Sequence, residues 1–91
     1  MSNKKPKIKK NKNLGKKFIM FVKPIDKNGN VIEYECGWLQ TNPETKLVFS
    51  MKEASIFVEK EEGHGSFSDW KKFFEEEYPN WKINSTPKYL D

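Results

Sequence analysis

Residues 16–40, "KKFIMFVKPIDKNGNVIEYECGWLQ", decide how the rest of the chain folds. Two runs rich in β-branched and aromatic residues flank an Asn-Gly pair, which is the strongest short-range sequence signal for a β-hairpin. Pro24 has no backbone N–H to donate, so the first strand is predicted to be frayed or at a sheet edge near the turn. The sequence therefore predicts that the fold begins with an antiparallel hairpin.

The register of this hairpin depends on the turn between the two runs. A two-residue turn at Asn28 and Gly29 places Phe21 opposite Cys36 and aligns apolar residues with apolar residues. The alternative is a bulge at Gly29 in a three-residue loop. That register places three residues of the first strand, Phe18, Met20 and Val22, on the face that carries Tyr34, Cys36 and Trp38 of the second run. Because both faces of the first strand are apolar, we expect it to be covered on both sides or central in its sheet.

The second run alternates, with Tyr34, Cys36 and Trp38 on one face and two glutamates on the other. This alternation predicts that the aromatic face packs inward and that Cys36 is a small core residue. A second interpretation makes Trp38, Tyr34 and Phe21 a stacking platform for unpaired bases, with Lys23 following the phosphates. The glutamates on the opposite face favour core packing, because they leave the aromatic face as the one to be buried.

A third strand and a first helix are predicted next. Residues 47–50, "LVFS", form the short third strand, and Ser50 with Glu53 has the spacing of a capping box. A helix is therefore predicted from Met51 to about Glu61. Its buried residues are predicted to be Met51, Ala54, Phe57 and Val58.

A second helix and a last strand complete the predicted domain. Ser66 or Ser68 caps this helix, and Pro79 ends it. Three aromatic residues have the i, i+3, i+4 spacing of one helix face: Trp70, Phe73 and Phe74. Trp81 and Ile83 then lie on one side of a short strand.

The predicted order, β-β-β-α-α-β, defines an α+β fold in which two helices pack on one face of a small antiparallel sheet. A chain of 91 residues supports one hydrophobic core at most. Residues 1–17 are expected to be a disordered lysine-rich tail, because they contain too few apolar groups to offset the entropy of ordering. Residues 18–84 are expected to form the single domain, and residues 85–91 a loosely ordered C-terminal tail.

Charge is distributed unevenly along the chain. Residues 1–17 carry a charge of +8, whereas residues 18–91 carry nine lysines against thirteen acidic residues, a net charge of −4. The tail lysines are Lys4, Lys5, Lys7, Lys9, Lys10, Lys12, Lys16 and Lys17. The chain has no arginine, and an ammonium group acts as a point charge without bidentate geometry, so the tail favours sequence-independent phosphate binding. Abundant lysine without arginine also fits an AT-rich genome, such as that of a low-GC bacterium or one of its viruses.

Several classes of function are not expected. Cys36 is the only cysteine and His64 the only histidine, so we expect no intramolecular disulfide and no zinc site. His64 has no cysteine, aspartate or serine at a spacing typical of nucleophilic catalysis, so neither an enzyme nor a cofactor is predicted. The longest apolar run after the basic segment, residues 18–22, is too short for an export signal or a membrane span. We expect an intracellular, cytoplasmic, non-enzymatic protein.

Two hypotheses of function follow from the charges. The first is a nucleic-acid-associated accessory protein whose lysine tail binds phosphates without reading sequence. The second is a small protein-binding regulator or inhibitor, for example of the kind that phages direct at host machinery, which uses acidic helix ends and a sheet edge. The residues predicted to contact such a partner are Glu59, Glu61, Glu62, Glu75, Glu76, Glu77 and Trp81. The acidic helix ends also offer a surface to which the chain's own lysine tail could bind.

Overall fold

A computed structural model describes residues 12–90 of the chain. The elements in this range are β1 (Lys17–Ile19), β2 (Phe21–Pro24), the 3-10 helix η1 (Glu33–Glu35), β3 (Gly37–Gln40), β4 (Lys46–Val48), the 3-10 helix η2 (Met51–Glu53), β5 (Phe57–Val58), α1 (Phe67–Glu77), β6 (Trp81–Ile83) and β7 (Lys88–Leu90). The strands form two antiparallel sheets, with the orders β5-β1-β7 and β4-β3-β2-β6. The predicted α+β class is confirmed, whereas the predicted single sheet and two helices are corrected to two sheets and one α-helix.

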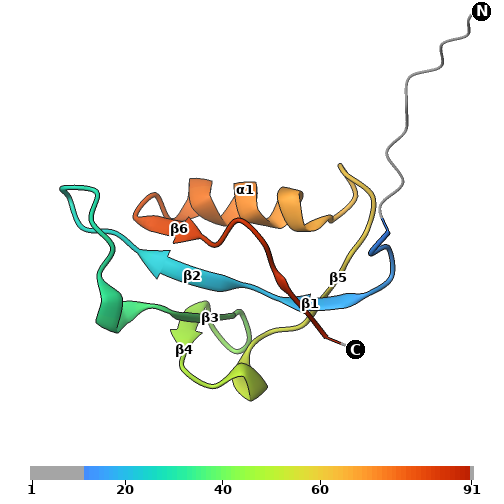
Figure 1. Ribbon diagram of the computed structural model, residues 1–91, viewed down its shortest axis with the longest axis horizontal. Helices are drawn as coiled ribbons and strands as arrows, with labels where there is room; N and C mark the ends of the chain where they lie inside the picture. The colour runs from blue at the N-terminus through green and yellow to red at the C-terminus, as the bar shows by residue number, and fades with distance from the viewer. Residues whose placement is uncertain (1–11, 91) are drawn as a thin grey trace, which may run out of the picture.

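The segment formed by β1 and β2 connects the two sheets (Figure 1). β1 is the central strand of the three-stranded sheet, and β2 is an inner strand of the four-stranded sheet. Met20 lies between them, and its carbonyl accepts a hydrogen bond from Leu39 N at 2.9 Å. Phe18, Ile19 and Met20 are consecutive and at most 1% exposed. Both faces of this segment are therefore covered, as its continuous apolar sequence predicted.

The loop after β2 has the bulge geometry that was the alternative on sequence grounds. Asp26 N donates to Asn30 O at 2.8 Å and closes a three-residue loop. Gly29 occupies this loop with a φ of +85°, a left-handed conformation that glycine adopts without steric cost. Alternate residues of the first two strands lie in the core, namely Phe18, Met20 and Val22, but Trp38 is not on their face, because it pairs with Phe21.

The second arm of the hairpin is interrupted, contrary to the sequence-based prediction. Ile25 forms an isolated bridge with Val31, but η1 follows, and regular pairing resumes only at Gly37. The 3-10 turn changes the register, so that Phe21 pairs with Trp38 and not with Cys36. Neither of the predicted registers of the long strand pair is therefore maintained beyond η1.

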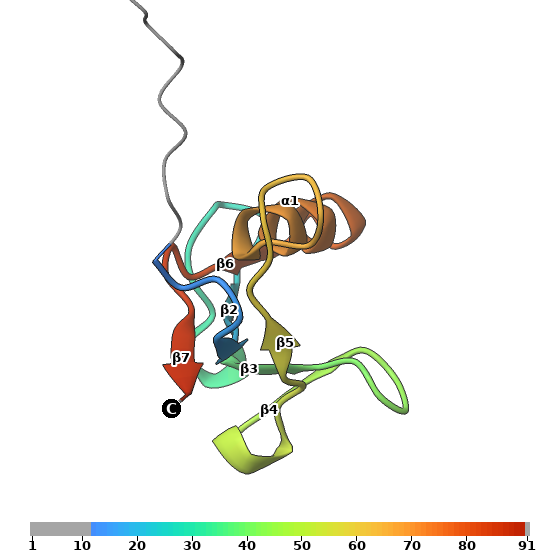
Figure 2. The same ribbon diagram turned by 90° about the vertical axis from the view of Figure 1, so that its right-hand side faces the viewer.

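The core lies between α1 and the strands. Figure 2 shows α1 on one side of the strands, with η2 and β4 on the far side from it. The buried cluster comprises Phe18, Met20, Val22, Leu39, Phe67, Phe74 and Ile83. The ring of Phe18 lies at its centre, with centroid distances of 5.5 Å to Phe57 and 5.8 Å to Phe67. Aromatic side chains thus supply much of the buried area of this small core.

The predicted first helix does not form. Ser50 does cap a turn, because its Oγ accepts a hydrogen bond from Lys52 N at 3.2 Å, but only η2 results. The chain then extends into β5, which pairs with β1. Ile56, Phe57 and Val58 favour extended backbone, and pairing with β1 satisfies their peptide groups. Of the four residues predicted to be buried on this helix, Ala54 is buried and Phe57 packs against the core.

The second predicted helix and the last predicted strand are confirmed as α1 and β6. Ser66 is the N-cap of α1, and the helix ends two residues before Pro79. Trp70 and Phe74 pack in or against the core, whereas Phe73 is 48% exposed.

The chain ends differ from the predicted tails where the structure describes them. Lys88–Leu90 form β7 and pair with β1, so these three residues of the predicted C-terminal tail belong to a sheet. Lys17 likewise belongs to β1, and Gly15 N donates to Glu59 O at 2.9 Å. Residues 1–11 and 91, with most of the predicted lysine tail, lie outside the described range.

Asp69 organises the loop that enters α1. Its Oδ2 accepts hydrogen bonds from the backbone N–H groups of Gly63, Gly65 and Ser66 at 2.7 to 3.0 Å. In return, Asp69 N donates to Ser66 Oγ, which completes a capping box. These hydrogen bonds, led by those from Ser66 and Gly65, lower the pKa of Asp69 from its ordinary value of 3.8 to about 2.

We predict that Asp69→Asn destabilises the fold above pH 4, because the neutral amide is a weaker acceptor for three converging N–H groups. A carboxylate whose pKa is lower in the folded state contributes stability above its unfolded pKa, and this stability is lost as the pH falls through the folded pKa. The difference in melting temperature between Asp69→Asn and the unmodified protein should therefore shrink from pH 4 towards pH 2. Glu76→Gln, an exposed position on the same helix, is the control. A difference in melting temperature that stays constant over this pH range would contradict the stabilising role assigned to the Asp69 carboxylate.

Candidate nucleic-acid interface

The four-stranded sheet has one face towards the core and one face away from it. On β2, Val22 and Pro24 are buried, so the alternating residues Phe21 and Lys23 point to the opposite face. On β6, Ile83 lies in the core, which places the adjacent Lys82 on the outer face. We call this surface the outer sheet face.

Two lysines oppose each other on the outer sheet face. Lys23 and Lys82 are direct cross-strand partners of β2 and β6. Within residues 12–90 the one salt bridge is that between Lys71 and Glu75, so this pair of cations has no carboxylate partner there. Like charges directly opposite each other are destabilising in a sheet. An anion bound between the two lysines would remove this cost.

Two aromatic rings lie beside the lysine pair. Phe21 and Trp38 pair across β2 and β3, and their rings meet edge to face with a centroid distance of 4.9 Å. Both are half-buried and lie outside the main core cluster. The prediction that Trp38 packs in the core together with Tyr34 is wrong, because η1 breaks the alternation and leaves Tyr34 78% exposed. Cys36 is also half-buried, and its Sγ lies 3.6 Å from the Ile32 carbonyl.

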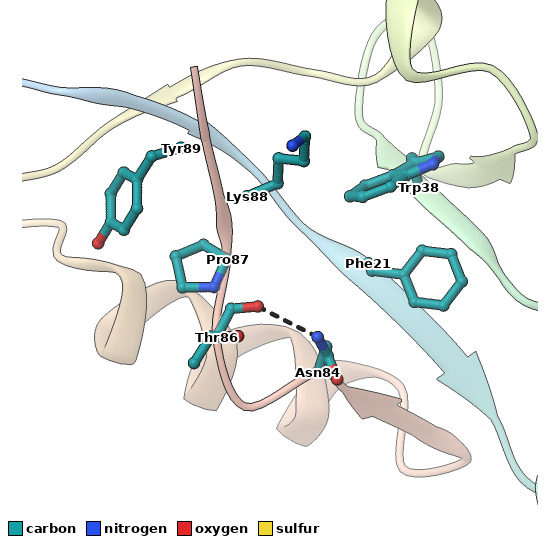
Figure 3. Close-up of a pocket in the computed structure, with 7 residues that line it drawn as sticks. All are labelled: Phe21, Trp38, Asn84, Thr86, Pro87, Lys88 and Tyr89. Carbon is teal, nitrogen blue, oxygen red and sulfur yellow. Dashed lines mark hydrogen bonds between the residues drawn. The ribbon is translucent and has the colours of Figure 1, made fainter. Parts of the chain in front are cut away.

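A groove of about 350 Å³ adjoins these rings. It is lined by Phe21, Trp38, Asn84, Thr86, Pro87, Lys88 and Tyr89. Figure 3 shows the two rings on one side and the segment that carries Pro87 on the other, with Lys88 between Tyr89 and Trp38 in this view. No carboxylate is among the lining residues. We call this site the aromatic groove.

Backbone pairing and a hydrogen bond position the far wall of the aromatic groove. Asn84 N donates to Phe21 O at 2.9 Å, which extends β6 by one position, and Asn84 Nδ2 donates to Thr86 O at 3.3 Å. Tyr89 belongs to β7 and contacts the ring of Phe18. Burial, reinforced by the negative charge of Glu59, raises the pKa of the Tyr89 hydroxyl. Tyr89 is therefore neutral at physiological pH and anchors this wall against the core.

Two of the glutamates predicted to contact a protein partner instead make contacts within the fold. Glu59 is 6% exposed, and its Oε1 accepts a hydrogen bond from Phe67 N at 2.8 Å. Glu75 is half-buried and accepts from Ile83 N at 2.9 Å and from Lys71 Nζ at 3.3 Å. Both carboxylates connect α1 to neighbouring segments of the chain.

The other predicted contact residues do not form one patch. Glu61 and Glu62 precede α1, whereas Glu76 and Glu77 lie in its last turn, and all four are exposed. An eleven-residue helix is about 16 Å long, so the two acidic pairs lie well apart. Trp81 is half-buried and stacks on Tyr78 with a centroid distance of 4.2 Å.

The structure describes only three of the eight lysines of the predicted tail. Lys12, Lys16 and Lys17 are exposed. The remaining five lie outside the described residues: Lys4, Lys5, Lys7, Lys9 and Lys10. The sequence-based interpretations named Lys23 as a phosphate contact beside the aromatic residues, but they did not identify its cross-strand partner Lys82.

The described residues offer little for metal or redox chemistry. His64 is exposed in the loop before α1. Burial, with a smaller contribution from Glu33, raises the pKa of the Cys36 thiol, which disfavours the reactive thiolate. Within residues 12–90, no group of three or more histidine, cysteine or acidic side chains is placed to hold a metal ion. In the same range, no helix has the length and apolar character needed to cross a membrane.

Comparison of the chain with protein-family models, curated proteins and solved structures finds no match. The interface is therefore inferred from its own geometry and charge.

Sequence analysis did not identify Lys82 as the cross-strand partner of Lys23, and it did not identify most of the residues in the far wall of the aromatic groove. The signal for Lys82 was present, since Trp81 and Ile83 were predicted on one side of the last strand and Lys82 must then lie on the other. No comparable signal identified Lys88, because its position depends on the pairing of β7 with β1.

We predict that Glu59→Ala lowers the free energy of unfolding by about 1–3 kcal/mol, because it leaves Phe67 N–H buried without this acceptor. Chemical denaturation followed by circular dichroism measures this change. Glu61→Ala, at an exposed position, is the matched control and should change stability by less than about 0.5 kcal/mol. Equal effects of the two substitutions would refute a structural role for the Glu59 carboxylate.

Proposed function

We propose that this protein is a non-enzymatic, nucleic-acid-associated accessory protein that binds its partner through phosphates without reading sequence. The observation that carries the proposal is the Lys23–Lys82 pair, two facing cations without a carboxylate partner among residues 12–90. A phosphate backbone supplies the negative charge that this pair lacks. The absence of carboxylates among the residues lining the adjoining groove supports the same choice of ligand.

The lysine tail supplies the larger share of the electrostatic affinity in this proposal. Residues 1–17 carry a charge of +8, and their lysines have no acidic neighbour in sequence. Lysine ammonium groups neutralise phosphates as point charges, which gives affinity and fast association but no base specificity. The tail then holds the strand near the domain, and the outer sheet face contacts it locally.

We predict that two sets of lysine substitutions reduce the salt dependence of binding to a labelled single-stranded DNA of mixed sequence. Each phosphate contact contributes about 0.7 to the slope of log K against log salt, so Lys23→Gln with Lys82→Gln should reduce the slope by roughly 1.4. Replacing Lys4, Lys5, Lys7 and Lys9 by glutamine should reduce it by roughly 2.8. Fluorescence anisotropy over a series of salt concentrations measures the slopes.

Each control variant changes the net charge by the same amount as the variant that it matches. Lys27→Gln with Lys52→Gln matches the sheet-face variant, and the addition of Lys60→Gln and Lys72→Gln matches the tail variant; all four positions are exposed. These variants should retain most of the original slope. A scrambled DNA sequence should bind with similar affinity. If both members of a matched pair reduce the slope equally, binding follows net charge alone and the proposed contacts are wrong.

A second candidate function, protein binding by strand addition, is supported by the edge of the four-stranded sheet. β4 is the terminal strand of that sheet, and the next residue, Phe49, is 84% exposed. An edge strand followed by an exposed aromatic side chain offers both backbone pairing and an apolar anchor to an extended peptide. The exposed Glu76 and Glu77 are available to a basic partner.

For this second function, we predict that the unmodified protein captures a partner from a nuclease-treated host lysate. The Phe49→Ser variant should not capture this partner, because it lacks the aromatic side chain on which the partner is anchored. Tyr34→Ser removes a similarly exposed aromatic side chain from η1 and should retain the captured protein. Affinity capture followed by mass spectrometry provides the measurement. Retention by both variants would count against the edge of β4 as the contact.

A further inference from the structure

We propose that the aromatic groove binds an unpaired nucleobase, so that the protein selects single-stranded over duplex nucleic acid. This inference rests on the proposed function and adds the class of nucleic acid and the residues that recognise it. Trp38 and Phe21 provide the stacking surface, and lysines on neighbouring strands contact the flanking phosphates.

Phe21 and Trp38 meet edge to face at an interplanar angle of 67°, so the ring planes are inclined and do not cover each other. Both residues line the groove and are half-buried. The flat face of an aromatic ring next to an open groove is the surface on which bases stack, and any base can use it.

The size and polarity of the aromatic groove suit a nucleobase. A volume of about 350 Å³ lies at the lower end of the range typical of small-ligand sites, which suits one base with its sugar better than a folded peptide. Thr86 places a hydroxyl in the wall across from the rings, and Asn84, whose N–H donates to the carbonyl of Phe21, places an amide beside them. Such groups can hydrogen-bond to the edge of a base without requiring one particular base.

The lysines around the aromatic groove complement the charge of a phosphate backbone. Lys88 lines the groove, and Lys23 lies two residues from Phe21 on the same face of β2, where it pairs with Lys82. The stacking surface therefore has cations on both sides, along β2 and along β7. A single strand that places a base on the rings brings its adjacent phosphates towards these cations.

Stacking on the two rings separates single strands from duplexes. In a duplex both faces of each base are covered by neighbouring bases, so stacking on a side chain requires the base to be unstacked and unpaired first. The groove offers no wedge or strand that would replace the lost base pair. Lysine contacts to phosphate do not favour the single strand, because a duplex has the higher charge density, so selectivity for the single strand comes from the rings.

The experiment uses the full-length protein and two probes, an oligo-dT of about twelve nucleotides and a duplex hairpin with the same number of phosphates. The protein contains three tryptophans, and Trp38 is the one that lines the groove. Oligo-dT should quench tryptophan fluorescence in the unmodified protein and in Trp81→Phe, but much less in Trp38→Phe. The hairpin should bind more weakly and cause little quenching.

Substitutions measure the contribution of the rings. Trp38→Leu and Phe21→Leu should each weaken oligo-dT binding about tenfold and leave hairpin binding nearly unchanged. Trp81→Leu is the matched control, because Trp81 packs against the core from the opposite face of the same sheet and should leave oligo-dT affinity nearly unchanged. Circular dichroism verifies that each variant is folded. Lys88→Gln, at an exposed position, gives a test independent of packing and should weaken oligo-dT binding several-fold.

The outcomes distinguish this inference from the function on which it rests. Salt-dependent binding of both probes, with equal affinity and no change in Trp38 fluorescence, would overturn the base-stacking site and leave phosphate binding intact. Failure of both probes to bind at low salt would overturn the proposed function as well. If a protein ligand occupied the groove, Trp38→Leu would abolish protein capture from a nuclease-treated lysate and leave oligo-dT binding unchanged, which again overturns the base-stacking site.

Discussion

The burial of one continuous strand segment on both faces is the constraint on which the rest of the structure depends. Phe18, Ile19 and Met20 are almost completely inaccessible to solvent, and β1 and β2 also pair with strands on both edges. A segment surrounded in this way must recruit four other strands: β5 and β7 pair with β1, and β3 and β6 pair with β2. Since these partners come from distant parts of the sequence, their pairing also fixes where the C-terminal segment runs and forms the far wall of the groove.

The same constraint separates the two faces of the four-stranded sheet. The face that packs against α1 takes the apolar side chains of the core, so the residues that alternate with them are left on the other face. That face carries two aromatic rings and the Lys23–Lys82 pair, and Lys88 of β7 lines the adjoining groove, although residues 18–91 are acidic overall. Carboxylates are placed elsewhere: Glu59, Glu75 and Asp69 hold α1 and its entry loop in position through backbone N–H groups. These three acidic groups thus stabilise the fold on the helix side.

The sequence predicted the elements whose signals are local. The turn at Asn28 and Gly29, the Ser66 cap, the end of α1 before Pro79 and the short strand β6 follow from residues within a few positions of one another. The predicted helix from Met51 to Glu61 failed because a correct local cap at Ser50 was overridden by pairing of β5 with β1. The alternation around Tyr34 failed for a related reason, since a 3-10 turn interrupts the strand. Local propensity is weak compared with the free energy gained by satisfying a strand edge and covering the core.

The sequence by itself determined the α+β class, the first strand with two apolar faces, the separation of a basic segment from an acidic remainder and the use of lysine without arginine. Composition and short-range periodicity are sufficient for these properties. Only the tertiary structure decided that Phe21 and Trp38 lie outside the core, that Lys23 faces Lys82, and that Lys88 closes a groove beside them. These features depend on register between strands that are up to about seventy residues apart in sequence. Register at that separation is set by which side chains fill the common core, and this is a property of the whole fold.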